Sequence, residues 1–159
     1  MEVLHVFKRI LVPLDGSHDS SKAVDMAGDI AEKFDAEVLL LRVVVPEGAA
    51  IAAMTAPESA SSAQIAIEAA EEMVRQDKAA GRKYLAGLRK TLQDRGVKTS
   101  TVVEVGAAAK IIQQVAKQEK ADLIVMMTRG NTGVKRVLLG SVADAVVRSA
   151  VAPVLVIRR

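Results

Sequence analysis

One glycine-containing stretch of this sequence has the residue types that bind phosphate groups. It reads MTRGNTGVKRVLLGS over residues 127–141, after the apolar run ADLIVM and before the amphipathic run VADAVVRSA. Glycine is common where the backbone needs a positive φ or where a ligand approaches it closely. A helix that begins after Gly140 and Ser141 would also point its unpaired N–H groups at the same place. The stretch therefore predicts either a phosphate-binding loop or a plain turn.

A second polar stretch, PLDGSHDSS, follows the first apolar run of the chain. Asp15 in this stretch has oxygen atoms that can accept a hydrogen bond from a ribose hydroxyl or an adenine amino group, whereas loop amides and the helix start at Ser141 would bind phosphates. Simpler structural roles stay open for both residues. Asp15 can stabilise its own turn, DGS, and the pair Ser141 and Asp144 has the capping-box spacing that closes a helix start.

Several other chemistries lack their sequence signatures. There is no G-x-x-x-x-G-K-[ST], and no G-x-G-x-x-G follows the first apolar run, which argues against a P-loop enzyme and a dinucleotide dehydrogenase. His5 and His18 have no acidic or histidine partner at ligand spacing, so we expect no metal site. The chain has no cysteine and no constellation of serine, histidine and acid for nucleophilic catalysis.

Length and composition predict one domain without nucleic-acid or membrane partners. The chain has 159 residues, half of them apolar, with 22 basic and 19 acidic residues and a net charge of +3. This balance argues against nucleic-acid binding, and one tyrosine without tryptophan provides no platform for stacking bases. No apolar run reaches about 18 residues and no leader pattern begins the chain, so we expect a cytoplasmic protein.

Five short apolar runs rich in valine, isoleucine and leucine are typical of strands. They cover residues 9–14, 37–44, 99–105, 122–127 and 153–158. Several are continuous instead of alternating, as in parallel strands that are covered on both faces. Apolar residues at helical spacing lie between them. The chain therefore predicts an α/β fold, with a five-stranded parallel sheet, right-handed crossovers and helices on both faces.

The expected strand order is 3-2-1-4-5, with two helices on each face. In this order the first and fourth strands flank the switch point, and ligands bind beyond the carboxyl ends of strands at such a point. Asp15 and residues 127–141 would then line one crevice. Pro13 has no N–H to donate, so we expect it where pairing ends in its strand. The last strand, VLVIRR, is apolar and lies at an open edge, which predicts a homodimer formed through this strand.

The segment over residues 46–64 has a composition unlike that of its neighbours. It is rich in alanine, serine and glycine and contains two prolines. We expect a mobile loop here and not a linker between domains. Residues 1–159 are therefore expected to form a single domain.

The stretches described above resemble the universal stress protein family over nearly the whole chain. The matching pieces are RILVPLDGSHDSSKAVDMA, EVLLLRVV, VEVGAAAKIIQQVAKQEKADLIVM and RGNTGVKRVLLGSVADAVVRSAVAPVLVIR. The resemblance implies a Rossmann-like fold, similar to that of adenine nucleotide alpha hydrolases, and a role as a stress-response regulator or sensor. Nucleotide-binding members of the family carry G-x2-G-x9-G-[ST] after the fourth strand. Gly130 and Gly140-Ser141 fit its second part, whereas Met127 replaces the first glycine.

The resemblance also implies an adenine-nucleotide site. Adenine would lie near Pro13, Asp15 and the backbone of Val43. The residues expected to face the ribose and phosphates are Met127, Arg129, Gly130, Asn131, Thr132, Gly133, Gly140, Ser141 and Val142. The expected ligand is ATP, with ADP and AMP as alternatives, and Mg²⁺ would be held through the phosphates. No residue has the pattern of a dedicated general base, so we expect at most slow ATP hydrolysis.

The family also contains members that bind no nucleotide, and Met127 keeps that alternative open. If the position needs φ above zero, methionine there costs strain of about 1 to 3 kcal/mol; if φ is negative, its amide can still serve. The alternative function is a dimeric protein-interaction module of the same fold that binds no nucleotide.

Overall fold

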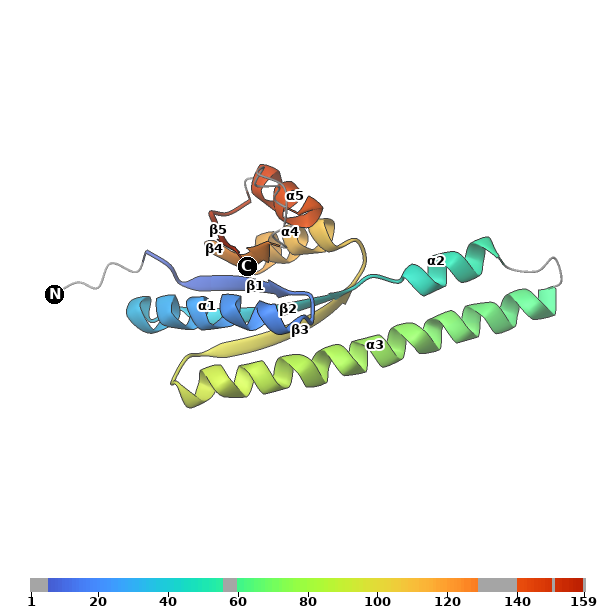
Figure 1. Cartoon of the computed structure of the whole chain (residues 1–159), viewed down its shortest axis with the longest axis horizontal. Coiled ribbons are helices and arrows are strands. Elements are labelled where there is room, and N and C mark those ends of the chain that lie inside the picture. Colours follow the sequence, from blue (N-terminus) through green and yellow to red (C-terminus); the bar gives the residue numbers. More distant parts are fainter. Residues whose placement is uncertain (1–5, 56–59, 129–139, 150, 159) are drawn as a thin grey trace.

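The computed structural model describes residues 6–55, 60–128, 140–149 and 151–158 of the chain (Figure 1). Its elements are, in order, β1 (Arg9–Leu14), the 3-10 helix η1 (His18–Ser20), α1 (Ser21–Phe34), β2 (Glu37–Val44), α2 (Glu47–Met54), α3 (Ala60–Asp94), β3 (Thr99–Val105), α4 (Ala108–Gln118), β4 (Leu123–Thr128), α5 (Ser141–Ser149) and β5 (Val154–Arg158). The strands form one sheet in the order β3-β2-β1-β4-β5, and all pairs are parallel. The predicted sheet and strand order are confirmed.

Two helices cover each face of the sheet, as expected. One core lies between the sheet and helices α1 and α3 and contains Val12, Leu40 and Leu85. The other lies under α4 and α5 and contains Leu11, Leu41 and Ile112. Because successive strand residues point to opposite faces, a strand that is covered on both sides must be apolar at every position. The continuous Val, Ile and Leu runs follow from this requirement. Within the described residues, no helix is long and apolar enough to cross a bilayer.

The central ladder between β1 and β4 is short. These strands pair only at Ile10 with Leu123 and at Leu11 with Ile124, whereas β1 and β2 stay paired as far as Leu14. β4 continues along β5 to Thr128. The carboxyl end of β1 is therefore paired on one side only, and its β4 side is left for other groups.

Pro13 lies on the side of β1 where pairing has ended. The carbonyl of Arg9 accepts a hydrogen bond from the N–H of Asp122 at the β4 side, and the carbonyl of Lys8 accepts from Glu37 at the β2 side. In a parallel strand this direction alternates from residue to residue, so the backbone nitrogen of Pro13 points toward β4. Because the β1–β4 ladder stops at Leu11, the missing N–H removes no ladder hydrogen bond, which confirms the prediction for Pro13.

The prediction of a loop over residues 46–64 was wrong for most of its length. Helix α2 covers Glu47–Met54, and α3 begins at Ala60. Alanine is the strongest helix former, and the composition that we interpreted as a loop is mainly alanine. Pro46 lies at the N-cap of α2, where a proline removes no helical hydrogen bond. Residues 56–59 lie outside the described part.

Helix α3 has 35 residues and is much longer than the sheet is wide. Its second half packs on the sheet, where Leu85 and Leu92 are fully buried and a Cβ on Gly81 would lie 3.1 Å from Cγ of Arg42. Its first half projects beyond the sheet together with α2 (Figure 1). We call α2 and residues 60–80 of α3 the arm.

Glu37 links the amino ends of three strands. One of its oxygens accepts from the Arg9 guanidinium at 2.8 Å, and the other accepts from the Ser100 hydroxyl at 3.0 Å. The hydrogen bond from Arg9, aided by Ser100 and by the positive charges of Arg9 and Lys98, lowers the pKa of Glu37 although partial burial opposes this shift. The carboxylate of Glu37 therefore stabilises the fold only while it is ionised.

Replacement Glu37→Gln should make the stability of the protein less sensitive to acid. The folded chain binds a proton at Glu37 less readily than the unfolded chain, so this stabilisation is complete above the unfolded pKa of about 4.3 and is lost as pH falls through the lower folded value. Urea unfolding of wild type and Glu37→Gln from neutral to acid pH checks this. Equal slopes of stability against pH below about 4.3 would contradict it.

Candidate functional site

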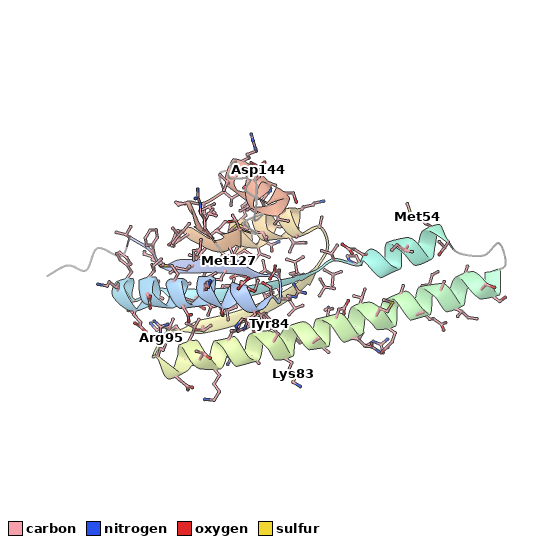
Figure 2. The ribbon with its side chains drawn as sticks, in the orientation of Figure 1. Met54, Lys83, Tyr84, Arg95, Met127 and Asp144 are labelled. Carbon is pink, nitrogen blue, oxygen red and sulfur yellow. The ribbon has the colours of Figure 1, made fainter. Side chains whose placement is uncertain are left out.

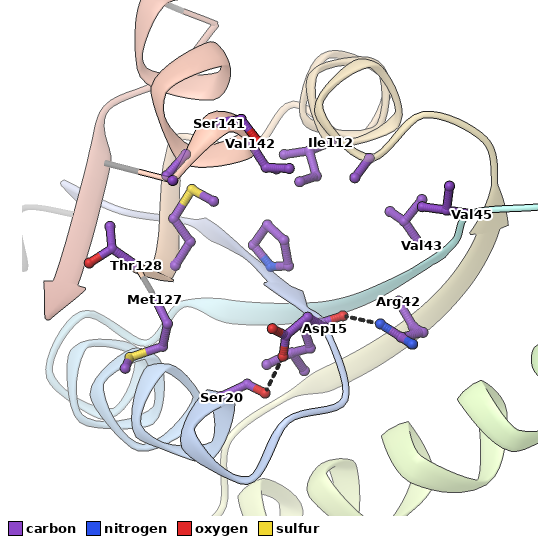
Figure 3. A pocket seen from close by; sticks show the side chains of 16 residues that line it. Asp15, Ser20, Arg42, Val43, Val45, Ile112, Met127, Thr128, Ser141 and Val142 are labelled. Carbon is purple, nitrogen blue, oxygen red and sulfur yellow. Dashed lines mark hydrogen bonds between the residues drawn. The ribbon is translucent and has the colours of Figure 1, made fainter. Parts of the chain in front are cut away.

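A pocket of about 370 Å³ lies where β1 and β4 stop pairing (Figure 3). Its walls come from the carboxyl ends of β1, β2 and β4 and from the amino ends of α4 and α5. This is the switch point of the sheet, because the chain turns from β1 to β2 in one direction and reaches β4 in the other. The crevice expected from the strand order is therefore present.

The structure brings seven of the predicted site residues into this pocket. They are Pro13, Asp15, Val43, Met127, Gly140, Ser141 and Val142. The other five predicted residues, Arg129, Gly130, Asn131, Thr132 and Gly133, lie outside the described part of the chain. The arrangement of the seven is established as geometry, and their role in binding remains a prediction.

Four lining residues were not predicted from the sequence. Ser20, Arg42 and Thr128 contribute polar groups, and Ile112 contributes an apolar wall. Arg42 had a signal that could have been used, since it is the only charged residue within the apolar run VLLLRVV and precedes the carboxyl end of the strand. Ser20 and Ile112 had none, because their helices contribute to the pocket only through tertiary packing.

Asp15 is held by the turn that follows β1. One of its carboxylate oxygens accepts from the N–H of Ser17 at 2.9 Å and from the Ser20 hydroxyl at 3.1 Å. Gly16 lies between them with φ of 83°, a conformation that favours glycine. The local role considered for Asp15 is therefore real, and it fixes the carboxylate at the pocket wall.

Ser20 connects Asp15 to helix α3. Its side chain is almost fully buried, and its hydroxyl lies 3.3 Å from the hydroxyl of Tyr84. Close by, the Arg42 guanidinium donates to the carbonyl of Leu14 at 3.4 Å (Figure 3). These contacts join one wall of the pocket to the part of α3 from which the arm projects.

Helix α5 begins at the opposite wall. The N–H of Asp144 donates to the carbonyl of Gly140 at 2.9 Å, which makes Gly140 the N-cap and Ser141 the first helical residue. The Asp144 carboxylate accepts instead from Arg148 at 2.8 Å. The capping-box alternative for Ser141 and Asp144 was therefore wrong by one position, and the first N–H groups of α5 have no acceptor within the helix.

Comparison with known proteins agrees with this geometry. The family model described as the universal stress protein family matches residues 7–158. The chain belongs to the universal stress protein family. It is 37% identical to universal stress protein MJ0531 of Methanocaldococcus jannaschii, over 98% of this chain and 84% of the relative. It is 31% identical to universal stress protein YxiE of Bacillus subtilis, over 96% of this chain and 100% of the relative.

Solved structures of the family have the same fold. Protein MJ0577 of Methanocaldococcus jannaschii superposes with a TM-score of 0.76 at 26% identity, covering 97% of each chain. A universal stress protein in complex with cAMP superposes with a TM-score of 0.65 at 24% identity, covering 96% of this chain and 97% of the other. At this identity the second comparison supports the Rossmann-like fold alone.

Met127, which replaces a glycine of the family motif, is an ordinary strand residue. It lies in β4, and the non-glycine residues with positive φ in the described chain are Asp35 and Lys120. The strain considered for Met127 is therefore absent. Its side chain packs with the core under α1 and α3, and Figure 3 shows it directed toward that side of the pocket. The backbone amide is not excluded from ligand contact by its conformation.

Val43 presents a backbone carbonyl where β1 has ended. Glu37 of the same strand bonds toward β1, and the alternation of a parallel strand gives Val43 the same direction. The last residue of β1, Leu14, pairs with Arg42. The carbonyl of Val43 therefore points past the end of β1, at a residue that lines the pocket.

Proposed function

We propose that this universal stress protein binds ATP in the pocket between β1 and β4 and acts as a cytoplasmic stress-response regulator or sensor. One observation carries the proposal: where the β1–β4 ladder ends, Asp15 and the start of α5 lie on opposite walls of one pocket (Figure 3). One wall offers acceptors for a nucleoside and the other offers donors for phosphates. Occupancy by nucleotide would then set the order of nearby loops and the choice of partner.

The nucleoside half of ATP fits the side formed by β1 and β2. The carbonyl of Val43 can accept from the adenine amino group, and the Asp15 carboxylate can accept from a ribose hydroxyl. Pro13, Val45 and Ile112 give this part of the pocket an apolar surface for the ring. Pockets for such ligands combine mainly apolar walls with a few placed polar groups.

The phosphates fit the start of α5. Unpaired N–H groups at the start of a helix bind anions, and the helix dipole favours negative charge there. The intervening segment, residues 129–139, contains three basic residues and no acidic residue, and it joins Thr128 to Gly140, both of which line the pocket. We infer that this segment contributes Gly130 to phosphate binding and that Mg²⁺ is held through phosphate oxygens.

Hydrolysis of the bound nucleotide should be slow at most. Asp15 is the only acidic residue among those that line the described pocket, and it already accepts two hydrogen bonds from its own turn. A general base needs to reach the proton of the attacking water. Binding, and not turnover, is the activity that this arrangement favours.

We also propose that two copies pair through β5. This strand lies at an edge of the sheet, and its residues from Val154 to Ile157 are only half-buried in the single chain. Covering an apolar edge strand with a second copy removes a surface that promotes aggregation. The resulting homodimer would be isologous.

The decisive experiment is to look for nucleotide in the purified protein. Acid release followed by ultraviolet absorbance and chromatography would detect adenine nucleotide, and the chain itself absorbs little because it has one tyrosine and no tryptophan. We expect about one nucleotide per chain, or uptake of one when ATP is added. A chain that neither carries nor takes up nucleotide would instead be an interaction module of the same fold.

Replacement Met127→Gly should enlarge the rise in melting temperature that ATP produces. The Met127 side chain lines the pocket, so its removal makes room for the ligand, while the melting temperature of the free protein falls because packing is lost and glycine weakens a strand. Thermal unfolding with and without ATP checks this. The variant Met127→Ala separates bulk from backbone freedom, because both variants should act alike if bulk decides. An unchanged rise in both would contradict the prediction.

A further inference from the structure

The arm exposes large apolar side chains that the described chain does not cover. They are Ile51 and Met54 on α2 and Ile65, Ile67 and Met73 on α3, and Met54 is 88% and Ile65 is 68% exposed. Figure 2 shows Met54 at the end of α2, far from the sheet. Scattered apolar residues on a surface are normal, whereas five on one short projecting hairpin mark a contact surface.

Helix α2 also has little support of its own. It has eight residues and contacts α3, where a Cβ on Gly48 would lie 2.9 Å from the methyl carbon of Met73. Isolated helices of this length are marginal in water, and most of their stability comes from packing. A further surface against the arm would supply that packing.

The charges of this region are separated along the chain. Residues 43–74 contain five glutamates and no lysine or arginine, whereas residues 75–98 contain eight lysines and arginines and two aspartates. The distal half of the arm is therefore acidic and apolar, and the following part of α3 is basic. Four of these basic residues form no ion pair with any described residue. They are Lys78, Arg82, Lys83 and Arg89.

The outward face of α3 has both kinds of charge in sequence. Figure 2 shows Lys83 pointing away from the sheet. Ile65 lies 18 residues earlier, which is about five turns, so it shares this face. Glu72, between them, is close to the same line of the helix. Along this face the surface changes from apolar and acidic to basic.

We propose that the arm binds the arm of a second copy of this chain, with the two α3 helices antiparallel. A two-fold axis near residues 77 and 78 would place Glu72 of each copy opposite Lys83 of the other. The distal apolar residues of one copy would then lie against the aliphatic stems of the basic residues of its partner. A parallel arrangement would instead place Glu72 opposite Glu72 and Lys83 opposite Lys83, which is repulsive.

This surface lies apart from the strand edge proposed above for dimerisation. The arm projects from helix α3, which packs on β2 and β3, whereas β5 is the strand at the opposite edge of the sheet. One chain could use both surfaces at once. Arm pairing would then join strand-paired dimers into a larger assembly, so a mass alone does not identify the contact, and distances are needed.

Spin labels give the distances directly, because the chain has no cysteine of its own. In Ala79→Cys, labelled near the proposed axis, pulsed electron resonance should find a label pair within roughly 20 Å, since packed helices lie about 8 to 10 Å apart. In Ala69→Cys, labels should be about 25 Å apart or more, because about 17 residues of helical rise separate them. Absence of the short distance in Ala79→Cys would overturn the proposal, as would equally short distances at both positions.

Charge reversal tests the pairing independently. Glu72→Lys or Lys83→Glu alone should weaken association of the arms about tenfold, whereas the double variant Glu72→Lys/Lys83→Glu should restore it, because opposite charges face each other again. Circular dichroism controls for folding, and both side chains are on the surface. Sedimentation and the Ala79→Cys distance serve as readouts. If the single variants associate as wild type does, or if the double variant fails to recover, the second copy is not the occupant. Capture of a basic amphipathic peptide by a chain that does not self-associate would also overturn it.

Discussion

ATP with Mg²⁺ at about a hundred times its Kd should raise the melting temperature of the wild-type protein by roughly 5 to 10 °C. A ligand that binds only the folded state stabilises it by RT ln(1 + [L]/Kd), which is about 2.7 kcal/mol at that excess. For a chain of this size each kcal/mol corresponds to about 2 to 4 °C. Adenosine should have a much smaller effect, because it lacks the phosphates that the start of α5 would bind. Differential scanning calorimetry or fluorimetry checks both.

Replacement Gly140→Val should abolish the ATP-induced rise. A Cβ on Gly140 would meet no atom within 4 Å, and Gly140 does not have a positive φ, so the free protein should tolerate the side chain. A branched side chain at the N-cap of α5 would block the approach of a phosphate to the first N–H groups. Gly87→Val is the matched control, since its Cβ would also meet nothing and it lies on α3, away from the pocket. An undiminished rise in Gly140→Val, or an equal loss in Gly87→Val, would contradict the site.

Replacement Leu40→Ala should destabilise the fold by about 2 to 5 kcal/mol. Leu40 lies in β2, is fully buried, and packs in the core under α1 and α3. Truncation removes apolar contacts and leaves a cavity that a sheet held between β1 and β3 can close only in part. Urea unfolding should show a lower midpoint with an unchanged slope. Because proteins of this kind are stable by only about 5 to 15 kcal/mol, this is a large fraction of the total.

Val6→Ala serves as the control for the Leu40 variant. Val6 is exposed at the start of the described chain, so its truncation should change the free energy of unfolding by less than about 0.5 kcal/mol. A loss in Val6→Ala comparable with that in Leu40→Ala would mean that general weakening, and not core packing, explains the result.

The sheet could be predicted from the sequence because its strands carry a strong local signal. A strand covered on both faces must be apolar throughout, and five such runs separated by helical spacing leave few topologies. The expected position of Pro13 followed from the same reasoning, since its missing N–H is tolerated only where pairing ends. Asp15 and Ser141 could be placed in one crevice because both follow strands that flank the switch point.

The parts that could not be predicted depend on contacts that are distant in sequence. The alanine-rich segment before residue 64 has no apolar periodicity, and it forms helices because α2 packs against α3. Arg42 and Ser20 reach the pocket through the position of β2 and the packing of α1. The capping pattern at Ser141 was misassigned because Gly140 and Ser141 are both acceptable N-cap residues, and sequence alone does not distinguish them.

The contact between Tyr84 and Ser20 gives this protein an optical reporter of its own. Tyr84 is its only tyrosine, and there is no tryptophan, so tyrosine emission comes from a single known position. Its hydroxyl lies next to the serine that hydrogen-bonds to Asp15, on the helix that continues into the arm. Changes in the emission or its lifetime would therefore follow events at the junction of pocket and arm in the unlabelled chain. Nucleotide binding and arm pairing could be titrated in one cuvette, with Tyr84→Phe as the dark reference.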